Sequence, residues 1–166
     1  EASTGAGKSL DLGVWTVEAL DGKNARVAMT QPRRDAAEGV CVAAAARHGL
    51  KFGEDICFTT SEFKGNRRDT KLQISTTGVL INKFKKDPTL ADYNAVIVDE
   101  AHERDLNIDL TIGLLKRANQ LRAEAGQPAI KIILASATLE QGKFAEFFGI
   151  NEKARIQSEG KLHKVN

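Results

Sequence analysis

Two short segments, far apart in the chain, place the strongest constraint on how it can fold. Near the start, residues 2–9 read ASTGAGKS, a run of small residues that ends in Gly-Lys-Ser. Downstream, the apolar run Ala95–Val98 leads directly into Asp99 and Glu100. A glycine-rich loop that opens a helix binds phosphate through its backbone N–H groups, and a continuous apolar run is typical of a strand covered on both faces of a parallel sheet. Together the two segments predict an α/β fold that holds a phosphate group beside two carboxylates.

The rest of the chain alternates segments of helical and of strand character, which favours a mostly parallel sheet flanked by helices. Turn signals separate the segments: Gly49 follows an alanine-rich helical stretch, and Gly126-Gln127-Pro128 follows a longer one. A polar loop is expected at residues 64–69, between two of the strands. The predicted helices span residues 8–20, 34–48, 77–86, 106–124 and 139–148. The predicted strands span residues 25–30, 56–60, 72–76, 95–98 and 130–135.

The composition is that of an ordinary soluble globular protein. A length of 166 residues suits one domain, and 42% hydrophobic with 28% charged residues is typical of such a domain. No apolar run approaches the roughly 20 residues of a membrane span and no signal-peptide pattern opens the chain, so we expect an intracellular protein. The net charge of +2 is too small to indicate nucleic acid by itself. Cys41 and Cys57 lack metal-site spacing, which favours buried free thiols over a disulfide or a metal site.

The residue types in the two motifs fit the hydrolysis of a nucleoside triphosphate with Mg²⁺. Lys8 would reach the β- and γ-phosphates, and the Ser9 hydroxyl would bind the metal ion. Asp99 would hold the same ion through water, and Glu100 would orient and deprotonate the attacking water. Both acids follow a strand, and ligands of open α/β sheets bind at the carboxyl ends of strands. The simpler alternatives are a chance loop before a helix and a solvated acidic turn after a strand.

Five motifs in a fixed order carry a resemblance to a known family. After the phosphate loop come TQPRR at residues 30–34, STTGVL at 75–80, DEAHER at 99–104 and SAT at 136–138. In this order the motifs resemble those of the first RecA-like domain of the DEAH-box helicases, members of helicase superfamily two. The resemblance runs from residue 2 to about residue 149. It implies a RecA-like P-loop NTPase domain, in which a mostly parallel sheet is flanked by helices.

The resemblance also implies how the chain is organised and what it does. Residues 1–150 would form the first RecA-like ATP-binding domain, truncated at the strand that normally precedes the phosphate loop, so we expect a fragment of a longer protein. Residues 151–166 would begin the connection to a second RecA-like domain, which would supply arginine fingers. Further C-terminal domains of the parent protein would grip a single strand of nucleic acid, with RNA favoured and no membrane involved.

The implied function is hydrolysis of ATP, or of other nucleoside triphosphates, with Mg²⁺, which drives translocation on and unwinding of RNA. A DNA helicase or DNA-remodelling ATPase is the alternative from the same chemistry. A catalytically inactive helicase-like scaffold is a third interpretation. Intact phosphate-loop and acidic residues argue against the scaffold.

The functional residues of the family transfer to this chain position by position. Arg34 would pack against the nucleotide base, and His102 would connect the nucleotide site to movement between domains. The nucleotide-binding set is Thr4, Gly5, Ala6, Gly7, Lys8, Ser9 and Arg34. The catalytic set is Glu100, Lys8, Asp99 and His102, and the metal set is Ser9 and Asp99. The nucleic-acid set, which would touch the sugar-phosphate backbone, is Thr30, Gln31, Pro32, Arg33, Arg34, Thr76, Thr77 and Gly78. The coupling set is Ser136 and Thr138.

Other residues have simpler explanations. Arg33 and Arg34 could be solvated charges at the start of a helix, and Ser136 and Thr138 could be small polar residues that end a strand. The basic cluster Lys83, Lys85 and Lys86 is interpreted as complementing a helix dipole rather than as a nucleic-acid contact. Surface positions are expected for His48 and His163, and packing roles for Trp15, Phe52, Phe58 and Phe84.

Three positions depart from what the family favours. Thr77 stands where an acidic residue is common, Cys57 where a more polar residue is expected, and Asn94 where a small residue or histidine is preferred. None of the three touches the phosphate chemistry, but they make the transfer of substrate details unsafe.

Overall fold

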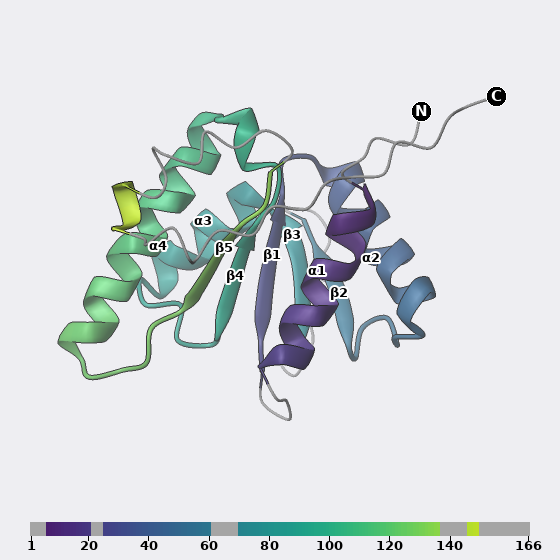
Figure 1. Cartoon of the computed structure of the whole chain (residues 1–166), viewed down its shortest axis with the longest axis horizontal. Helices are drawn as coiled ribbons and strands as arrows, with labels where there is room; N and C mark the ends of the chain where they lie inside the picture. The colour runs from purple at the N-terminus through teal and green to yellow at the C-terminus, as the bar shows by residue number, and fades with distance from the viewer. Residues whose placement is uncertain (1–5, 21–24, 61–69, 137–145, 150–166) are drawn as a thin grey trace.

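The computed structural model describes residues 6–20, 25–60, 70–136 and 146–149. These residues form a five-stranded sheet in which every strand runs parallel to its neighbours, in the order β2-β3-β1-β4-β5 (Figure 1). The predicted RecA-like α/β class is therefore confirmed. The strands are β1 (Val27–Gln31), β2 (Ile56–Thr59), β3 (Leu72–Thr76), β4 (Ala95–Val98) and β5 (Lys131–Leu134). The helices are α1 (Ala6–Ala19), α2 (Arg34–His48), α3 (Thr77–Lys86) and α4 (Leu106–Glu124), with a short 3₁₀ helix η1 (Ala101–Glu103).

Alternate residues along the strands serve two separate hydrophobic cores, one on each face of the sheet. In β4, Ala95 and Ile97 pack in a cluster with residues of α1 and α2, whereas Val96 and Val98 pack with residues of α3 and α4. Successive side chains of a strand point to opposite faces, so a strand covered on both sides must be apolar throughout. Figure 1 shows the two helix pairs on opposite sides of the strands. This two-sided burial explains why the run before the acidic motif is continuously apolar.

Both cysteines belong to this apolar interior. Cys41 in α2 and Cys57 in β2 are buried free thiols, as the sequence predicts. Burial raises the pKa of the Cys41 thiol to about 12, so this thiol remains protonated and unreactive at neutral pH.

Local signals set the ends of the two longest helices. Pro32 precedes α2, and Gly49 ends it in the left-handed conformation, with φ 63° and its N–H bonded to the carbonyl of Ala45. The Asp105 side chain caps α4 by accepting a hydrogen bond from the N–H of Ile108. Gly49 and Asp105 are residue types that satisfy the unpaired backbone groups of helix ends, whereas Pro32 ends the preceding strand because it has no N–H to donate. The sequence therefore carries the information for these helix limits.

Predicted and observed element limits differ by two residues or fewer wherever both can be compared. The largest shifts are at α1, predicted to start at residue 8, and at β1, predicted to start at residue 25. The predicted loop 64–69 and most of the predicted helix 139–148 lie outside the described residues, as does the tail from residue 151. Within the described residues, no helix is both long and apolar enough to span a bilayer.

A topological switch point, where the connections after adjacent strands depart to opposite faces of the sheet, lies between β1 and β4. These strands lie side by side, with Thr30 opposite Val98. The chain leaves β1 for α2 on one face and leaves β4 for α4 on the other. Connections that depart to opposite faces open a crevice at the carboxyl ends of the two strands, where ligands of open α/β sheets bind. The residues that end β1 and follow β4 therefore face a candidate site.

Three predictions about the burial of side chains need correction, two of packing and one of a surface position. Phe84 is buried as expected, but Trp15 is 57% exposed and Phe52 is 48% exposed. The Phe52 ring still contacts Phe58, with centroids 5.7 Å apart. His48 is half-buried rather than a surface residue without contacts, because its Nε2 lies 2.9 Å from Asp11 Oδ1. The fold thus leaves two of the aromatic side chains that the sequence predicts to pack partly exposed to solvent.

Candidate nucleotide and metal site

Asp99 stands directly after β4, at the carboxyl edge of the sheet. Its N–H donates to the carbonyl of Thr30 at 3.2 Å, so the pairing of β1 with β4 continues up to the acid. Asp99 is only 5% exposed. A buried carboxylate requires hydrogen-bond donors, because its removal from water is otherwise unfavourable by several kcal/mol.

Three donors converge on the Asp99 carboxylate. The Ser9 hydroxyl, in the first turn of α1, donates to Oδ2. Gln31 Nε2, at the end of β1, donates to the same oxygen at 2.6 Å. Oδ1 accepts from the N–H of Glu100 at 2.9 Å. The start of α1, the end of β1 and the turn after β4 therefore meet at one carboxylate.

The chemistry of this donor set fits Mg²⁺ bound together with a nucleotide. Mg²⁺ prefers oxygen ligands and, at nucleotide sites, takes one or two carboxylates plus phosphate oxygens and water. Ser9 Oγ and Asp99 Oδ2 already share a hydrogen bond, so one hydroxyl and one carboxylate are directed to the same point. The described residues contain no group of three or more His, Cys, Asp or Glu residues able to hold a metal ion.

Glu100 follows Asp99 in a left-handed backbone conformation, with φ 53° and ψ 36°. Such a conformation is unfavourable by about 1 kcal/mol or more for a residue with a long side chain. Arg104, at the other end of η1, adopts the same conformation, with φ 49°. Strained residues that persist in a fold often mark functional turns. In this turn the Glu100 N–H points to Asp99 Oδ1 and donates a hydrogen bond to it.

The electrostatic surroundings of Glu100 favour its protonated form. Burial raises the pKa of the Glu100 carboxyl above its ordinary value, and the Asp99 carboxylate raises it further. His102 and Lys8 act in the opposite direction. His102 Nδ1 lies 3.4 Å from Glu100 Oε2 but makes no hydrogen bond to any described residue. A general base works best when its pKa lies near the working pH, so the upward shift suits proton transfer.

The structure describes only part of the predicted phosphate loop. Thr4 and Gly5 lie outside the described residues, and the backbone of Ala6 and Gly7 begins α1. Lys8 is exposed in the first turn of α1, close enough to influence the Glu100 carboxyl. The positive end of the α1 dipole adds to this local charge. The loop residues that are described therefore lie beside the two acids.

The predicted nucleic-acid residues fall at the same edge of the sheet but differ in exposure. Gln31 and Thr76 end adjacent strands and lie opposite one another. Thr30 and Gln31 are 1% and 3% exposed, so their side chains face the interior in this structure. The exposed members are Arg33, Arg34 and Gly78; Pro32 and Thr76 are half-buried, and Thr77 is buried.

The predicted coupling segment is tied to the site through its backbone. The N–H of Ala135 donates to the carbonyl of Val98, and the N–H of Ala101 donates to the carbonyl of Ala135, both at 2.9 Å. Ser136 follows this junction and is half-buried. Thr138 lies outside the described residues. The end of β5 therefore contacts the turn that carries both acids.

Sequence reasoning missed two polar contacts. Gln31 was predicted to touch nucleic acid, yet its side chain contacts Asp99. The parallel register could have indicated this contact, but only once β1 and β4 were known to be neighbours. Asp11 in α1 also forms ion pairs with Arg47 at 2.8 Å and with His48 at 2.9 Å. The spacing of these residues gave no signal, because they join two different helices.

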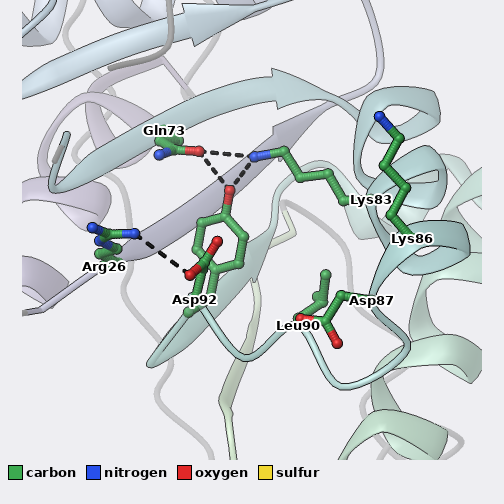
Figure 2. A pocket seen from close by; sticks show the side chains of 8 residues that line it. Arg26, Gln73, Lys83, Lys86, Asp87, Leu90 and Asp92 are labelled. Carbon is green, nitrogen blue, oxygen red and sulfur yellow. Dashed lines mark hydrogen bonds and ion pairs between the residues drawn. The ribbon is translucent and has the colours of Figure 1, made fainter. Parts of the chain in front are cut away.

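A polar cavity lies at the opposite, amino edge of the sheet (Figure 2). Lys83 was interpreted as complementing a helix dipole, but its Nζ donates to Gln73 Oε1 at 2.8 Å and also contacts the Tyr93 hydroxyl. Burial lowers the pKa of the Lys83 ammonium. Lys83 does lie in the last turn of α3, as the dipole interpretation requires, and it also joins α3 to β3. The cavity measures about 260 Å³ and is lined by Arg26, Gln73, Lys83, Lys86, Asp87, Leu90, Asp92 and Tyr93.

Comparison with known proteins agrees with this geometry. The model of the DEAD/DEAH box helicase family matches residues 1–147. Over 173 aligned residues, the chain is 34% identical to the probable ATP-dependent RNA helicase DHX35 homolog of Caenorhabditis elegans. The alignment covers 98% of the chain and 23% of that protein. The chain is 36% identical to the ATP-dependent RNA helicase HrpA of Borreliella burgdorferi, over 89% of the chain and 17% of that protein. It is also 36% identical to the probable ATP-dependent RNA helicase DHR2 of Saccharomyces cerevisiae, over 87% of the chain and 20% of that protein.

The sheet, the phosphate-loop helix and the paired acids define a P-loop nucleotide-binding domain. With the match over residues 1–147, this chain belongs to the DEAD/DEAH box helicase family. It spans about a fifth of the length of the relatives described above.

Proposed function

We propose that this chain is the ATP-binding half of an RNA helicase and hydrolyses ATP with Mg²⁺ when a single strand of RNA is bound. The observation that carries the proposal is the junction at Asp99, where donors from α1 and β1 meet beside Glu100. Hydrolysis of a nucleoside triphosphate needs a phosphate cradle, a held cation and a group that orients water. Each of the three has a candidate within this junction.

The residue roles follow from their positions. Ser9 and Asp99 would hold Mg²⁺, which supplies charge stabilisation to the phosphates when it is bound. Lys8 would bind the phosphates, together with the loop Thr4–Gly7. Glu100 would take a proton from the attacking water, and His102, next to it, would help to couple the site to other parts of the protein.

RNA is favoured over DNA as the strand because three relatives at 34–36% identity are named as RNA helicases. Arg33 and Arg34 are exposed beside the carboxyl edge of the sheet, where a phosphate backbone or a nucleotide base could reach them. Contacts to the sugar-phosphate backbone carry no sequence information, so binding should be tolerant of base sequence.

The greater length of the relatives supports further domains as partners. A second RecA-like domain would add arginine fingers, which are worth roughly 10³ to 10⁵ in rate in other NTPases. The segment after β5, with Ser136 and Thr138, would link hydrolysis to the movement of that domain.

Binding of a fluorescent ATP analogue to the full-length protein tests the nucleotide site. Lys8→Ala should weaken binding about tenfold or more, because a hydrogen bond to a charged group contributes about 1.5–3 kcal/mol. Lys85→Ala, which removes an exposed lysine from α3, is the matched control and should leave binding unchanged. Equal affinity of the wild-type protein and Lys8→Ala would argue against the assignment.

A further inference from the structure

The side chain of Gln31 occupies an unusual place for a residue of a nucleic-acid motif. It ends β1, is 3% exposed, and donates from Nε2 to Asp99 Oδ2 at 2.6 Å. A carboxylate oxygen only accepts hydrogen bonds, so the amide nitrogen of Gln31, and not its oxygen, must face Asp99. The side chain of Gln31 is therefore directed at the acid, and at 3% exposure it offers little surface to a strand of nucleic acid.

We propose that Gln31 is a positioning residue that fixes the Asp99 carboxylate for Mg²⁺ and transmits strand binding to that carboxylate. The proposal rests on the proposed function. It assigns Gln31 to the metal side of the site, whereas the TQPRR pattern alone assigned it to the strand.

Two side chains hold Oδ2 of the Asp99 carboxylate. Ser9 and Gln31 both donate to this oxygen. If the Ser9 hydroxyl binds a cation through an oxygen lone pair, its hydrogen can still donate to Oδ2, so the hydroxyl is engaged on both sides. Gln31 is then the donor to Oδ2 that is not itself a ligand of the cation, while the Glu100 N–H holds Oδ1. Residues that orient a metal ligand in this way typically contribute a factor of 10–100 to metal affinity.

Gln31 is also connected to surface residues, through its neighbours along the chain and across the sheet. Gln31 is followed at once by Pro32, whose fixed φ and missing N–H make the link stiff, and then by the exposed Arg33. On its other side Gln31 lies opposite Thr76, which ends β3 and is the first residue of the second predicted nucleic-acid segment, Thr76 to Gly78. Movement of either segment at the surface would therefore displace the Gln31 amide relative to Asp99.

Such a link must act in both directions. If RNA changes the affinity for Mg²⁺ and nucleotide through Gln31, then Mg²⁺ and nucleotide change the affinity for RNA by the same factor. The link is short, because one side chain spans the distance from the end of β1 to the acid.

The test measures binding of fluorescent ADP by the full-length protein as Mg²⁺ is varied, with and without a single-stranded RNA oligonucleotide. Gln31→Met keeps the length of the side chain but removes its donor. Gln31→Asn keeps the amide but is too short to reach Asp99. Gln73→Met is the matched control, because Gln73 is also a buried amide on a neighbouring strand but lies at the opposite edge of the sheet.

We expect Gln31→Met to raise the Mg²⁺ concentration for half-maximal nucleotide binding by roughly 10-fold or more, while nucleotide binding without Mg²⁺ is unchanged. Gln31→Asn should show the same direction of change, and it keeps the test valid if Gln31→Met does not fold. The effect of RNA on nucleotide affinity should shrink in both variants and persist in Gln73→Met.

Two outcomes would overturn the proposal. Wild-type Mg²⁺ dependence in both Gln31 variants would remove the positioning role, and an unchanged RNA effect in both would remove the transmission. A wild-type protein whose nucleotide binding does not respond to Mg²⁺ would instead overturn the proposed function, and this result is distinct from the other two.

Discussion

Glu100 combines two features that are unfavourable for folding and favourable for chemistry. Its backbone is left-handed, with φ 53°, and burial beside the Asp99 carboxylate raises the pKa of its own carboxyl. A residue selected for stability alone would avoid both. The neighbouring acid is satisfied by three donors, whereas Glu100 faces His102 at 3.4 Å. At the scale of single residues, the two neighbouring acids therefore stand in different surroundings, which suits the different roles proposed for them.

Replacing Glu100 by Gln should raise the stability of the protein at pH 7 by up to about 1 kcal/mol after solvent screening. The sign follows from the raised pKa: between the unfolded and folded pKa values the folded state binds more protons, so the wild type loses stability as pH rises through that window. Glu100→Gln lacks this loss. Urea unfolding at pH 4 and pH 7 measures the difference, which should be larger at pH 7.

Glu103→Gln is the control for this prediction, because Glu103 is an exposed acid in the same turn. It should change stability little at either pH. A Glu100→Gln variant less stable than wild type at pH 7 would show that the ionised carboxyl has a stabilising contact.

At the scale of elements, one glycine inside α2 and one directly after it show how backbone conformation, apart from packing, affects the stability of the protein. Gly39 lies inside the helix, and Gly49 ends it with φ 63°; an added Cβ meets no atom within 4 Å at either position. Gly39→Ala should stabilise the protein by about 0.5–1 kcal/mol, because alanine favours helix. Gly49→Ala should destabilise it by about 1 kcal/mol, because the left-handed conformation disfavours a side chain. Thermal unfolding of both variants measures the opposite signs, and equal signs would contradict the assignment of the helix end.

The ion pairs of Asp11 hold the phosphate-loop helix α1 to the end of α2. Asp11 is nearly buried and accepts from Arg47 and His48. Asp11→Asn should destabilise the protein by about 1–3 kcal/mol, the usual effect of losing hydrogen bonds to a buried charged group. Glu18→Gln, an exposed acid of the same helix, is the control in denaturant unfolding. If both variants are equally stable, the ion pairs contribute nothing to the packing of α1.

The sequence predicts elements better than it predicts their neighbours, for a physical reason. The limits of α2 depend on Pro32 and Gly49, which act locally, and they were predicted to the residue. The strand order β2-β3-β1-β4-β5 depends on long-range packing and is not written in any local signal. For this reason the sequence indicated that Ser9 and Asp99 share a site but not that Gln31 contacts Asp99. The contacts of Lys83 with Gln73 and Tyr93 were missed for the same reason, since these residues lie outside α3.

At the scale of the whole molecule, the described part of the chain brings the start of α1 and the two acids Asp99 and Glu100 together at one edge of one sheet. Under the proposed function, transition-state charge on the transferred phosphate would be stabilised by arginines from a second domain. The chain alone should therefore hydrolyse ATP at least 10³-fold more slowly than the full-length protein. Steady-state phosphate release by the two proteins at saturating ATP measures this ratio, and comparable rates would contradict a role for a second domain.

The most direct test of the central claim is steady-state ATP hydrolysis by the full-length protein with no nucleic acid, with single-stranded RNA and with single-stranded DNA, alongside Glu100→Gln. The account predicts strong stimulation by RNA alone and its loss in Glu100→Gln. Equal stimulation by DNA would contradict the assignment to RNA. No hydrolysis under any of these conditions would contradict the claim that the junction at Asp99 and Glu100 is catalytic.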